Sequence, residues 1–66
     1  MISYKKLLDL LYYKGIKKTE FAKDLGLSSS TLAKLSKNEV VSLEIINRAC
    51  RYLKCQPGDI LDYVED

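Results

Sequence analysis

Hydrophobic residues recur along this chain at intervals of three and four, which is the spacing of one face of an α-helix. In the first such segment the apolar positions are Tyr4, Leu7, Leu8 and Leu11. Ser3 is a suitable N-cap for this segment, and Gly15 suits the left-handed residue that follows a helix end. The pattern therefore predicts a helix over Ser3–Lys14. We expect Tyr12 and Tyr13, near the end of that helix, to be partly buried.

Two shorter helices are predicted next, with a glycine between them. The first covers about Lys18–Leu25 and ends at Gly26, because glycine adopts a positive φ at the lowest cost. The second begins after the N-cap Ser28 and ends near Asn38, a residue that tolerates the left-handed conformation. The inward-facing residues are Phe21, Ala22 and Leu25 in the first helix, and Leu32 and Leu35 in the second.

A fourth and a fifth helix are predicted in the C-terminal half. Ser42 is the N-cap of a helix over about Leu43–Lys54, in which Glu44 is placed favourably against the helix dipole. The inward stripe of this helix is predicted as Leu43, Ile46, Cys50 and Leu53, flanked by Ile45, Ala49 and Tyr52. Pro57 suits the first position of a short terminal helix, whose apolar residues are Ile60, Leu61 and Val64. Since no β-hairpin signal occurs, we expect an all-α fold: a compact bundle of five short helices in a single domain over residues 1–66.

The composition excludes most catalytic chemistry. The 66 residues contain no histidine and only two cysteines. A histidine base, a nucleophile–histidine pair and a histidine or four-cysteine zinc site are therefore ruled out. The three glycines are too dispersed for a phosphate-binding loop. We expect a binding protein with no enzymatic activity, no metal and no cofactor.

Cysteine spacing and hydropathy predict where the protein resides. Cys50 and Cys55 are five residues apart, which is not the C-x-x-C spacing, and we expect their β-carbons to point to different sides. Free thiols are then expected, as in a reducing cytosol. No apolar run reaches the ~18 residues of a membrane span, and the N-terminal residues lack the apolar block of a signal peptide. We expect a cytoplasmic protein that does not enter a membrane.

The segment from Lys18 to Leu35 meets the requirements of a helix-turn-helix. This motif joins two helices at a wide angle through a turn of three or four residues. Ala22 supplies the small residue where the helices approach each other, and Gly26 supplies the positive φ of the turn. The apolar residues that hold the corner are Phe21, Leu25, Leu27, Leu32 and Leu35. A generic helical hairpin would have the apolar residues by chance, but the small residue, the glycine and the serine-rich cap at this spacing are more demanding.

On these residues the chain resembles the Xre-like, lambda-repressor-like (Cro-type) helix-turn-helix family, and the resemblance covers nearly the whole chain, including Cys55–Ile60. It implies a five-helix DNA-binding fold in which the helix after Ser28 enters the major groove. It implies base contacts from Ser29, Ser30, Thr31 and Lys34. We expect phosphate contacts from Lys17, Lys18, Lys37 and Asn38. The chain departs from the family pattern where Lys18, Ser36 and Asn38 replace a frequent glutamine, glutamate and glycine.

Side-chain chemistry is consistent with these assignments. Serine and threonine hydroxyls can donate or accept at a base edge, and the methyl group of Thr31 can contact a thymine methyl. Lys34 lies one turn beyond Ser30 on the same face and can reach guanine or a phosphate. None of these residues is a bidentate Arg, Asn or Gln reader. We therefore expect water, DNA shape and the spacing of two half-sites to contribute to specificity.

The net charge of +2 conceals an uneven distribution. Residues 1–38 hold eight lysines and three acids, a net charge of +5, whereas residues 39–66 hold three basic and six acidic residues, a net charge of −3. The basic half contains the helix-turn-helix. A DNA-binding surface needs such a one-sided distribution, because phosphates would repel the acidic end.

Together these features predict a sequence-specific, double-stranded DNA-binding transcriptional regulator, with repression as its mode of action. We expect a two-fold homodimer on a pseudo-palindromic site. The expected dimer interface comprises Ile45, Tyr52, Ile60, Leu61, Tyr63 and Val64. Two alternatives remain open at this point: an antitoxin that also binds a toxin, and a helical protein-interaction module without DNA binding.

Overall fold

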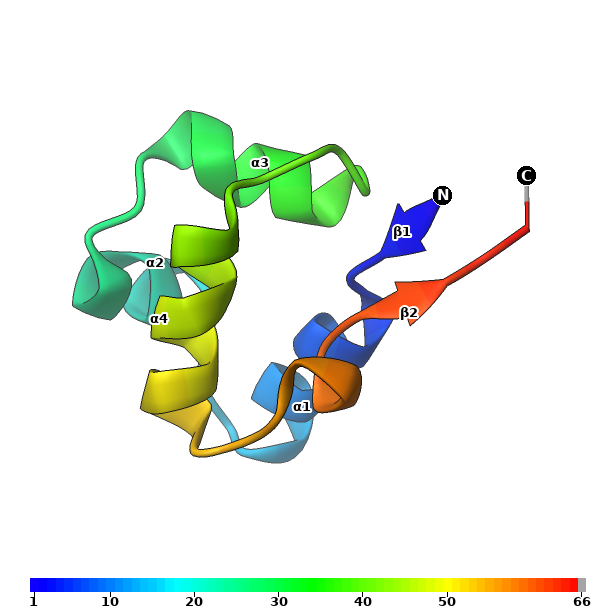
Figure 1. Cartoon of the computed structure of the whole chain (residues 1–66). Helices are drawn as coiled ribbons and strands as arrows, with labels where there is room; N and C mark the ends of the chain where they lie inside the picture. Colours follow the sequence, from blue (N-terminus) through cyan, green and yellow to red (C-terminus); the bar gives the residue numbers. More distant parts are fainter. Residues whose placement is uncertain (66) are drawn as a thin grey trace.

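The computed structural model describes residues 1–65 and contains four α-helices and two short strands in that range (Figure 1). In chain order the elements are β1 (Ile2–Ser3), α1 (Lys5–Tyr13), α2 (Lys18–Leu25), α3 (Ser29–Ser36), α4 (Leu43–Leu53), the 3-10 turn η1 (Pro57–Asp59) and β2 (Asp62–Tyr63). The two strands are antiparallel, with Ile2 opposite Tyr63 and Ser3 opposite Asp62. The mainly helical architecture is confirmed, but the number of helices and the all-α class are not.

The first helix is shorter than predicted. Its N-cap position is Tyr4, with no side-chain cap, whereas Ser3 lies in β1 and accepts a hydrogen bond at Oγ from the Lys5 N–H (3.2 Å). The expectation that Tyr12 and Tyr13 are partly buried is wrong, because both side chains point away from the core and are almost fully exposed. Gly15 has a φ of +72°, as expected for the residue that follows the helix end.

The second and third helices begin and end close to where the pattern placed them. α2 occupies Lys18–Leu25 and ends at Gly26, whose φ of +70° is left-handed. Ser28 is the N-cap of α3, and its Oγ accepts a hydrogen bond from the Thr31 N–H (3.2 Å). These boundaries depend on local cap and glycine chemistry, which is why the sequence predicts them well.

The inward stripe of α4 differs from the prediction at Leu43, which is exposed, and at Cys50, which is half-buried. Ile46, Ala49 and Leu53 are buried, whereas Leu43 leaves 80% of its surface exposed. Ala49 therefore replaces Leu43 as an inward residue. Leu43 is the first residue of the helix and lies at the rim of a surface hollow near β1.

The predicted fifth helix is wrong beyond its first turn. The chain makes the single 3-10 turn η1, stabilised by reciprocal hydrogen bonds between Gln56 and Asp59, and then becomes extended. Gly58 weakens a helix at this place, and Ile60, Tyr63 and Val64 after it are β-branched or aromatic residues that favour extended structure. Extension also allows the Val64 N–H to donate to the Met1 carbonyl oxygen (2.8 Å), which continues the pairing of β2 with β1.

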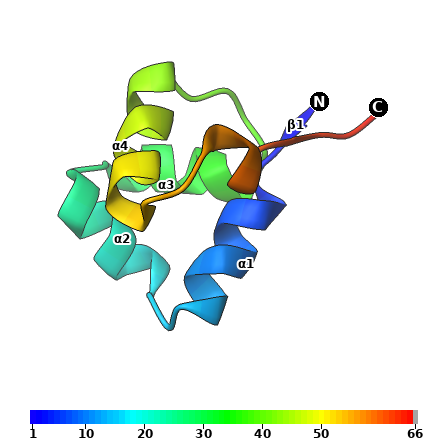
Figure 2. The same cartoon turned by 60° about the horizontal axis from the view of Figure 1, so that its bottom comes forward.

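The core lies between the four helices and η1. Its most enclosed side chains are Leu7, Leu11, Phe21, Leu35 and Ile60. Figures 1 and 2 show α2, α3 and α4 grouped together, with α1 on the other side and both ends of the chain leaving beside it. In Figure 1 α3 spans the top of the molecule, and its C-terminal end lies toward β1. No helix in residues 1–65 is long and apolar enough to cross a bilayer.

The two cysteines are free thiols that contact each other. We expected their side chains to point apart, but Lys54 ends α4 in the left-handed conformation and the Cys55 N–H donates to the Cys50 carbonyl oxygen (3.1 Å). The chain therefore folds back and places the two thiols within hydrogen-bonding reach. Burial, followed by the charge of Cys50, raises the pKa of the Cys55 thiol.

Three contacts from α4 hold α2 in place. The Phe21 and Tyr52 rings pack edge to face with centroids 5.8 Å apart. The Tyr52 O–H donates to Asp24 Oδ2 (2.7 Å), and Arg48 donates to the carbonyl oxygen of Leu25 at the end of α2 (3.3 Å). These contacts fix α2 against α4, so that the motif is supported from within.

The Tyr52–Asp24 hydrogen bond predicts a pH dependence of stability. Together with burial and the charges of Asp24 and Glu20, it raises the pKa of Tyr52 to about 12. An unfolded tyrosine titrates near pH ~10. The stabilising contribution is therefore complete below about pH 10 and is lost as the pH rises toward about 12. Urea unfolding followed by circular dichroism should show the stability advantage of the wild type over Tyr52→Phe shrinking across that range. A constant difference would contradict this assignment.

Candidate nucleic-acid interface

The helix-turn-helix consists of α2, a three-residue turn over 26–28 and α3. The Leu27 N–H donates to the Ala22 carbonyl oxygen (2.8 Å), which closes the end of α2 over the left-handed Gly26. Ala22, Leu25 and Leu35 are buried at the corner. The short turn and the small Ala22 allow the two helices to pack closely, which leaves the outer side of α3 accessible.

The exposed side of α3 carries hydroxyl, methyl and ammonium groups. Its exposed residues at helical spacing are Ser29, Ser30, Ala33, Lys34 and Lys37. Ser29, Ser30 and Lys34 were predicted as base contacts, and the structure brings them to one face. Ala33 was missed, although it lies four residues after Ser29, and a methyl group at this position is suited to a thymine methyl.

The hydroxyl groups at the start of α3 form a small network. Ser28 Oγ accepts from the Thr31 N–H and also contacts Ser30 Oγ (3.0 Å) and Thr31 Oγ1 (3.1 Å). A hydroxyl has one hydrogen and two lone pairs, so Ser28 can donate to one of these hydroxyls and accept from the other. Thr31 takes part in this network and is also half-buried. The side chain of Ser29, in contrast, makes no hydrogen bond within residues 1–65. Ser29 and Ser30 are therefore better placed for base contacts than Thr31.

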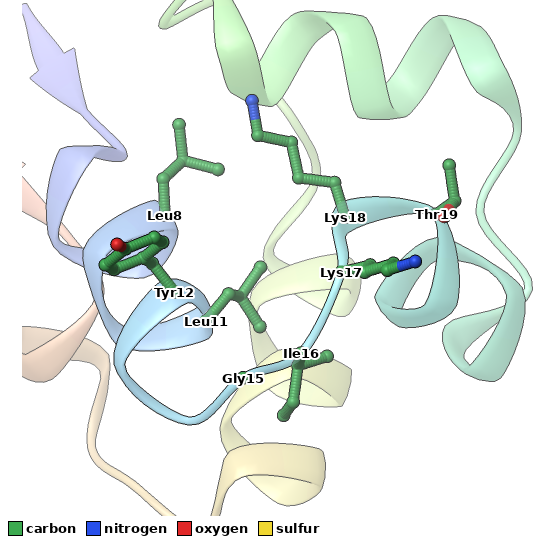
Figure 3. A pocket seen from close by; sticks show the side chains of 8 residues that line it. All are labelled: Leu8, Leu11, Tyr12, Gly15, Ile16, Lys17, Lys18 and Thr19. Carbon is green, nitrogen blue, oxygen red and sulfur yellow. The ribbon is translucent and has the colours of Figure 1, made fainter.

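The start of α2 is a basic helix terminus without a side-chain cap. Lys17 occupies the N-cap position in an extended conformation, and no side chain accepts from the first N–H groups of the helix. Such N–H groups and the helix dipole favour an anion, and phosphate is a common ligand at such a terminus. In Figure 3 Lys18 extends toward α3 while Lys17 turns toward Thr19, so two ammonium groups flank this terminus.

A hollow of about 570 Å³ opens beside the start of α2 (Figure 3). It lies between α1 and α2 and is lined by Leu8, Leu11, Tyr12, Gly15, Ile16, Lys17, Lys18 and Thr19. The lining contains no acidic side chain. The hollow therefore offers neither a pair of carboxylates for acid–base catalysis nor oxygen ligands for a hard cation.

The lysines of the motif are not neutralised by neighbouring acids. Lys17, Lys18, Lys34 and Lys37 are exposed and take part in none of the ion pairs or hydrogen bonds found between residues 1 and 65. The ion pairs of that range include Lys5–Asp9 (3.0 Å) and Glu44–Arg48 (3.5 Å), both within other helices. Four ammonium groups therefore remain available to phosphate.

The C-terminal end of α3 is fastened to the start of α1 by Asn38. Asn38 has a φ of +57°, and its Oδ1 accepts a hydrogen bond from the Tyr4 N–H (3.0 Å). The Tyr4 O–H donates to the Glu39 carbonyl oxygen (2.7 Å), while the Glu39 N–H donates back to the Lys34 carbonyl oxygen (2.9 Å). We call this arrangement the Tyr4–Asn38 link. The link occupies Oδ1 of the half-buried Asn38 side chain, and the predicted phosphate contact, which would use the Nδ2 donor, stays a prediction.

The residues predicted for the dimer interface do not form one exposed surface. The prediction is wrong for Ile60, which is fully enclosed in the core. Tyr52 packs on Phe21, and Ile45 and Leu61 are half-buried. Of the six predicted residues, Tyr63 and Val64 alone are exposed. Within residues 1–65 no group of three or more His, Cys, Asp or Glu side chains is arranged to hold a metal ion.

Comparison with known proteins places this geometry in a family. The Cro/C1-type helix-turn-helix DNA-binding domain matches residues 6–66. The chain belongs to this family. A solved structure of the transcriptional regulator VanUg superposes with a TM-score of 0.94 at 45% identity, covering 98% of this chain and 87% of that one. The uncharacterised HTH-type transcriptional regulator YozG of Bacillus subtilis (strain 168) is 36% identical over 50 residues, which are 73% of this chain and 60% of YozG.

Membership confirms the prediction of a helix-turn-helix DNA-binding domain of the Cro type. The match with VanUg extends over almost the whole chain, so the 3-10 turn and the terminal strands lie within the superposed region. The individual contacts of α2 and α3 with DNA stay predictions.

The Tyr4–Asn38 link predicts an order of stabilities for two substitutions. Asn38→Ala removes the acceptor of the Tyr4 N–H but keeps a β-carbon in the left-handed region, so we expect a loss of at least about 1 kcal/mol. Asn38→Gly also removes the acceptor but relieves the left-handed backbone, so it should be more stable than Asn38→Ala. Urea unfolding measures both values. If Asn38→Ala is as stable as the wild type, the side-chain bond contributes nothing.

Proposed function

We propose that this chain, as a single domain over residues 1–66, is a transcriptional regulator that binds double-stranded DNA sequence-specifically by placing α3 in the major groove. The observation that carries the proposal is the combination of an uncapped, basic α2 terminus with an exposed polar face on α3. The α2 terminus can bind a phosphate. The exposed face of α3 has the width of one helix and can lie against base edges.

In this proposal the contacts divide into two classes. Ser29, Ser30 and Lys34 contact base edges, and Thr31 adds its methyl group and its remaining hydrogen-bonding capacity. Lys17, Lys18 and Lys37 contact phosphates and set the position of the helix on the duplex. The N–H groups of the first turn of α2 add a contact that requires no side chain.

Repression is the regulatory mode that this architecture supports best. A module that covers its operator blocks other proteins by occupancy alone, whereas activation requires a further surface to recruit a partner. We place the protein in the cytoplasm with the DNA it binds, where a reducing environment keeps Cys50 and Cys55 as thiols.

We further propose that the protein binds as a two-fold homodimer to a pseudo-palindromic site. A single α3 of eight residues is only about 12 Å long and contacts few base pairs. Two copies related by two-fold symmetry double the number of contacts and add the half-site spacing to the specificity.

Salt dependence tests the phosphate contacts. Affinity for a duplex selected from random sequences should fall steeply as salt is raised, because each neutralised phosphate contributes about −0.9 to the slope of log K against log salt. Lys18→Gln should reduce the magnitude of the slope by about 1 per subunit. Lys14→Gln is the matched control, because it removes the same charge outside the proposed interface. Lys14 follows α1 and lies near Cys55. An affinity independent of salt would overturn the proposal.

Substitution of Lys34 separates base reading from phosphate binding. Lys34→Ala should remove ~1–3 kcal/mol of discrimination at one base position while leaving the other positions unchanged. Binding measured against a panel of single-base operator variants gives this pattern directly. A uniform loss of affinity for every sequence would instead assign Lys34 to a phosphate.

A further inference from the structure

Most of the exposed large hydrophobic side chains gather in one region of the surface. Within residues 1–65 they comprise Tyr12 and Tyr13 at the end of α1, and a second set of Met1, Ile2, Val40, Leu43, Tyr63 and Val64. The second set comes from β1, from β2 and the residue after it, and from the α3–α4 connection with the first residue of α4. We call this second set the strand-side patch.

The members of the strand-side patch are connected through the sheet and through a hollow. Ile2 lies opposite Tyr63 in the antiparallel pair, so these side chains share one face of the sheet. Ile2, Val40 and Leu43 line the same hollow of about 360 Å³, whose other walls include Tyr4 and Leu61. The patch is therefore one continuous surface built from segments distant in sequence.

The hollow is apolar, and no Lys, Arg, Asp or Glu side chain lines it. Beside it Val40 and Leu43 leave 87% and 80% of their surfaces exposed. The centre of a stable protein interface is depleted of charged residues in the same way. A region with both projecting side chains and a depression can fit a second copy of itself, because in a two-fold interface each contact occurs twice.

We propose that the strand-side patch is the surface through which two copies of this chain associate, with Val40 and Leu43 of each copy packed into the hollow of the other. The role of this dimer rests on the proposed DNA-binding function. The dimer contact itself is argued from the patch alone. It replaces the interface predicted from sequence, of which Tyr63 and Val64 remain as exposed members and Leu61 as part of the wall.

The extent of the patch is consistent with a dimer interface. A standard interface covers about 800 Å² on each partner, roughly one sixth of the 4660 Å² surface of this chain. An aromatic side chain such as Tyr63 can bury about 150–250 Å², and the five aliphatic members of the patch, which are 45–87% exposed, add to this area. The hollow in this patch, which no charged side chain lines, gives neither DNA nor a charged peptide a complementary surface.

The position of the patch suits two α3 helices on one duplex. The C-terminal end of α3 is tied to the patch region by the Tyr4–Asn38 link, so a contact there transmits a defined orientation to α3. The chain measures 31 × 23 × 20 Å. Two such modules joined near the C-terminal ends of their α3 helices would hold the N-terminal ends of these helices outward, toward successive major grooves.

Sedimentation velocity in the absence of DNA tests the association. At micromolar concentrations the wild type should sediment as a dimer of the 7.5 kDa chain. Val40→Glu and Leu43→Glu should each weaken the dimer at least tenfold, because each places a carboxylate in the partner's apolar hollow. Tyr13→Glu is the matched control, since Tyr13 is also 87% exposed but lies outside the patch. Both patch positions are exposed, so circular dichroism should show unchanged folding.

A second experiment compares the binding of the wild type and the patch variants to duplexes that contain one or two half-sites. The patch variants should keep the wild-type affinity for one half-site but lose cooperative binding to two. If the wild type is monomeric in solution, loss of cooperativity in the variants alone still supports the patch. A dimer or cooperative binding that survives both substitutions would overturn the proposal. A wild type that is monomeric and binds without cooperativity would also overturn it, because the patch would then serve another partner.

Failure of the protein to bind any DNA would contradict the proposed function. Sedimentation without DNA would still test the proposed dimer interface in that case.

Discussion

The position of α3 depends on a hydrogen-bonded link between residues far apart in the sequence. Asn38 adopts a left-handed backbone conformation that turns the chain out of α3, and its side-chain oxygen accepts the Tyr4 N–H. The buried Tyr4 ring then reaches the Glu39 carbonyl oxygen with its hydroxyl. One asparagine therefore ends the helix that would contact bases and joins it to the start of α1. A glycine would allow the same turn but would have no atom to make the join.

The remaining contacts of the fold hold the other helix of the motif against this fixed end. Phe21 is fully enclosed, and Tyr52 packs on its edge while donating to Asp24. Arg48 satisfies the carbonyl oxygen of Leu25 at the end of α2. All three contacts come from α4, and Lys17, Lys18, Lys34 and Lys37 make no ion pair or hydrogen bond within residues 1–65. The inner side is crowded and the outer side is polar, which is the division of roles that a DNA-binding module needs.

Local chemistry was sufficient to predict the motif but not its surroundings. The bounds of α2 and the cap of α3 follow from Gly26 and Ser28, whose effects act within a few residues. The pairing of the strands joins Met1 to Val64, and the Tyr4–Asn38 link spans 34 residues. A local sequence pattern cannot predict contacts between residues so far apart. The one available signal was that asparagine stands where the family commonly has glycine. The strand-side patch could not be predicted from the sequence either. The spacing of Leu43 fits an inward-facing helical stripe, but its side chain is exposed because Leu43 is the first residue of the helix.

The central claim is that the outer sides of α2 and α3 together bind duplex DNA. The most direct test is nuclear magnetic resonance of the ¹⁵N-labelled chain, titrated with a duplex selected for binding. Shifted amide signals should concentrate at the start of α2 over 17–20 and along α3 over 28–37, and signals from the end of α1 and from η1 should stay in place. Shifts confined to the strand-side patch, or the absence of shifts at α3, would contradict the account.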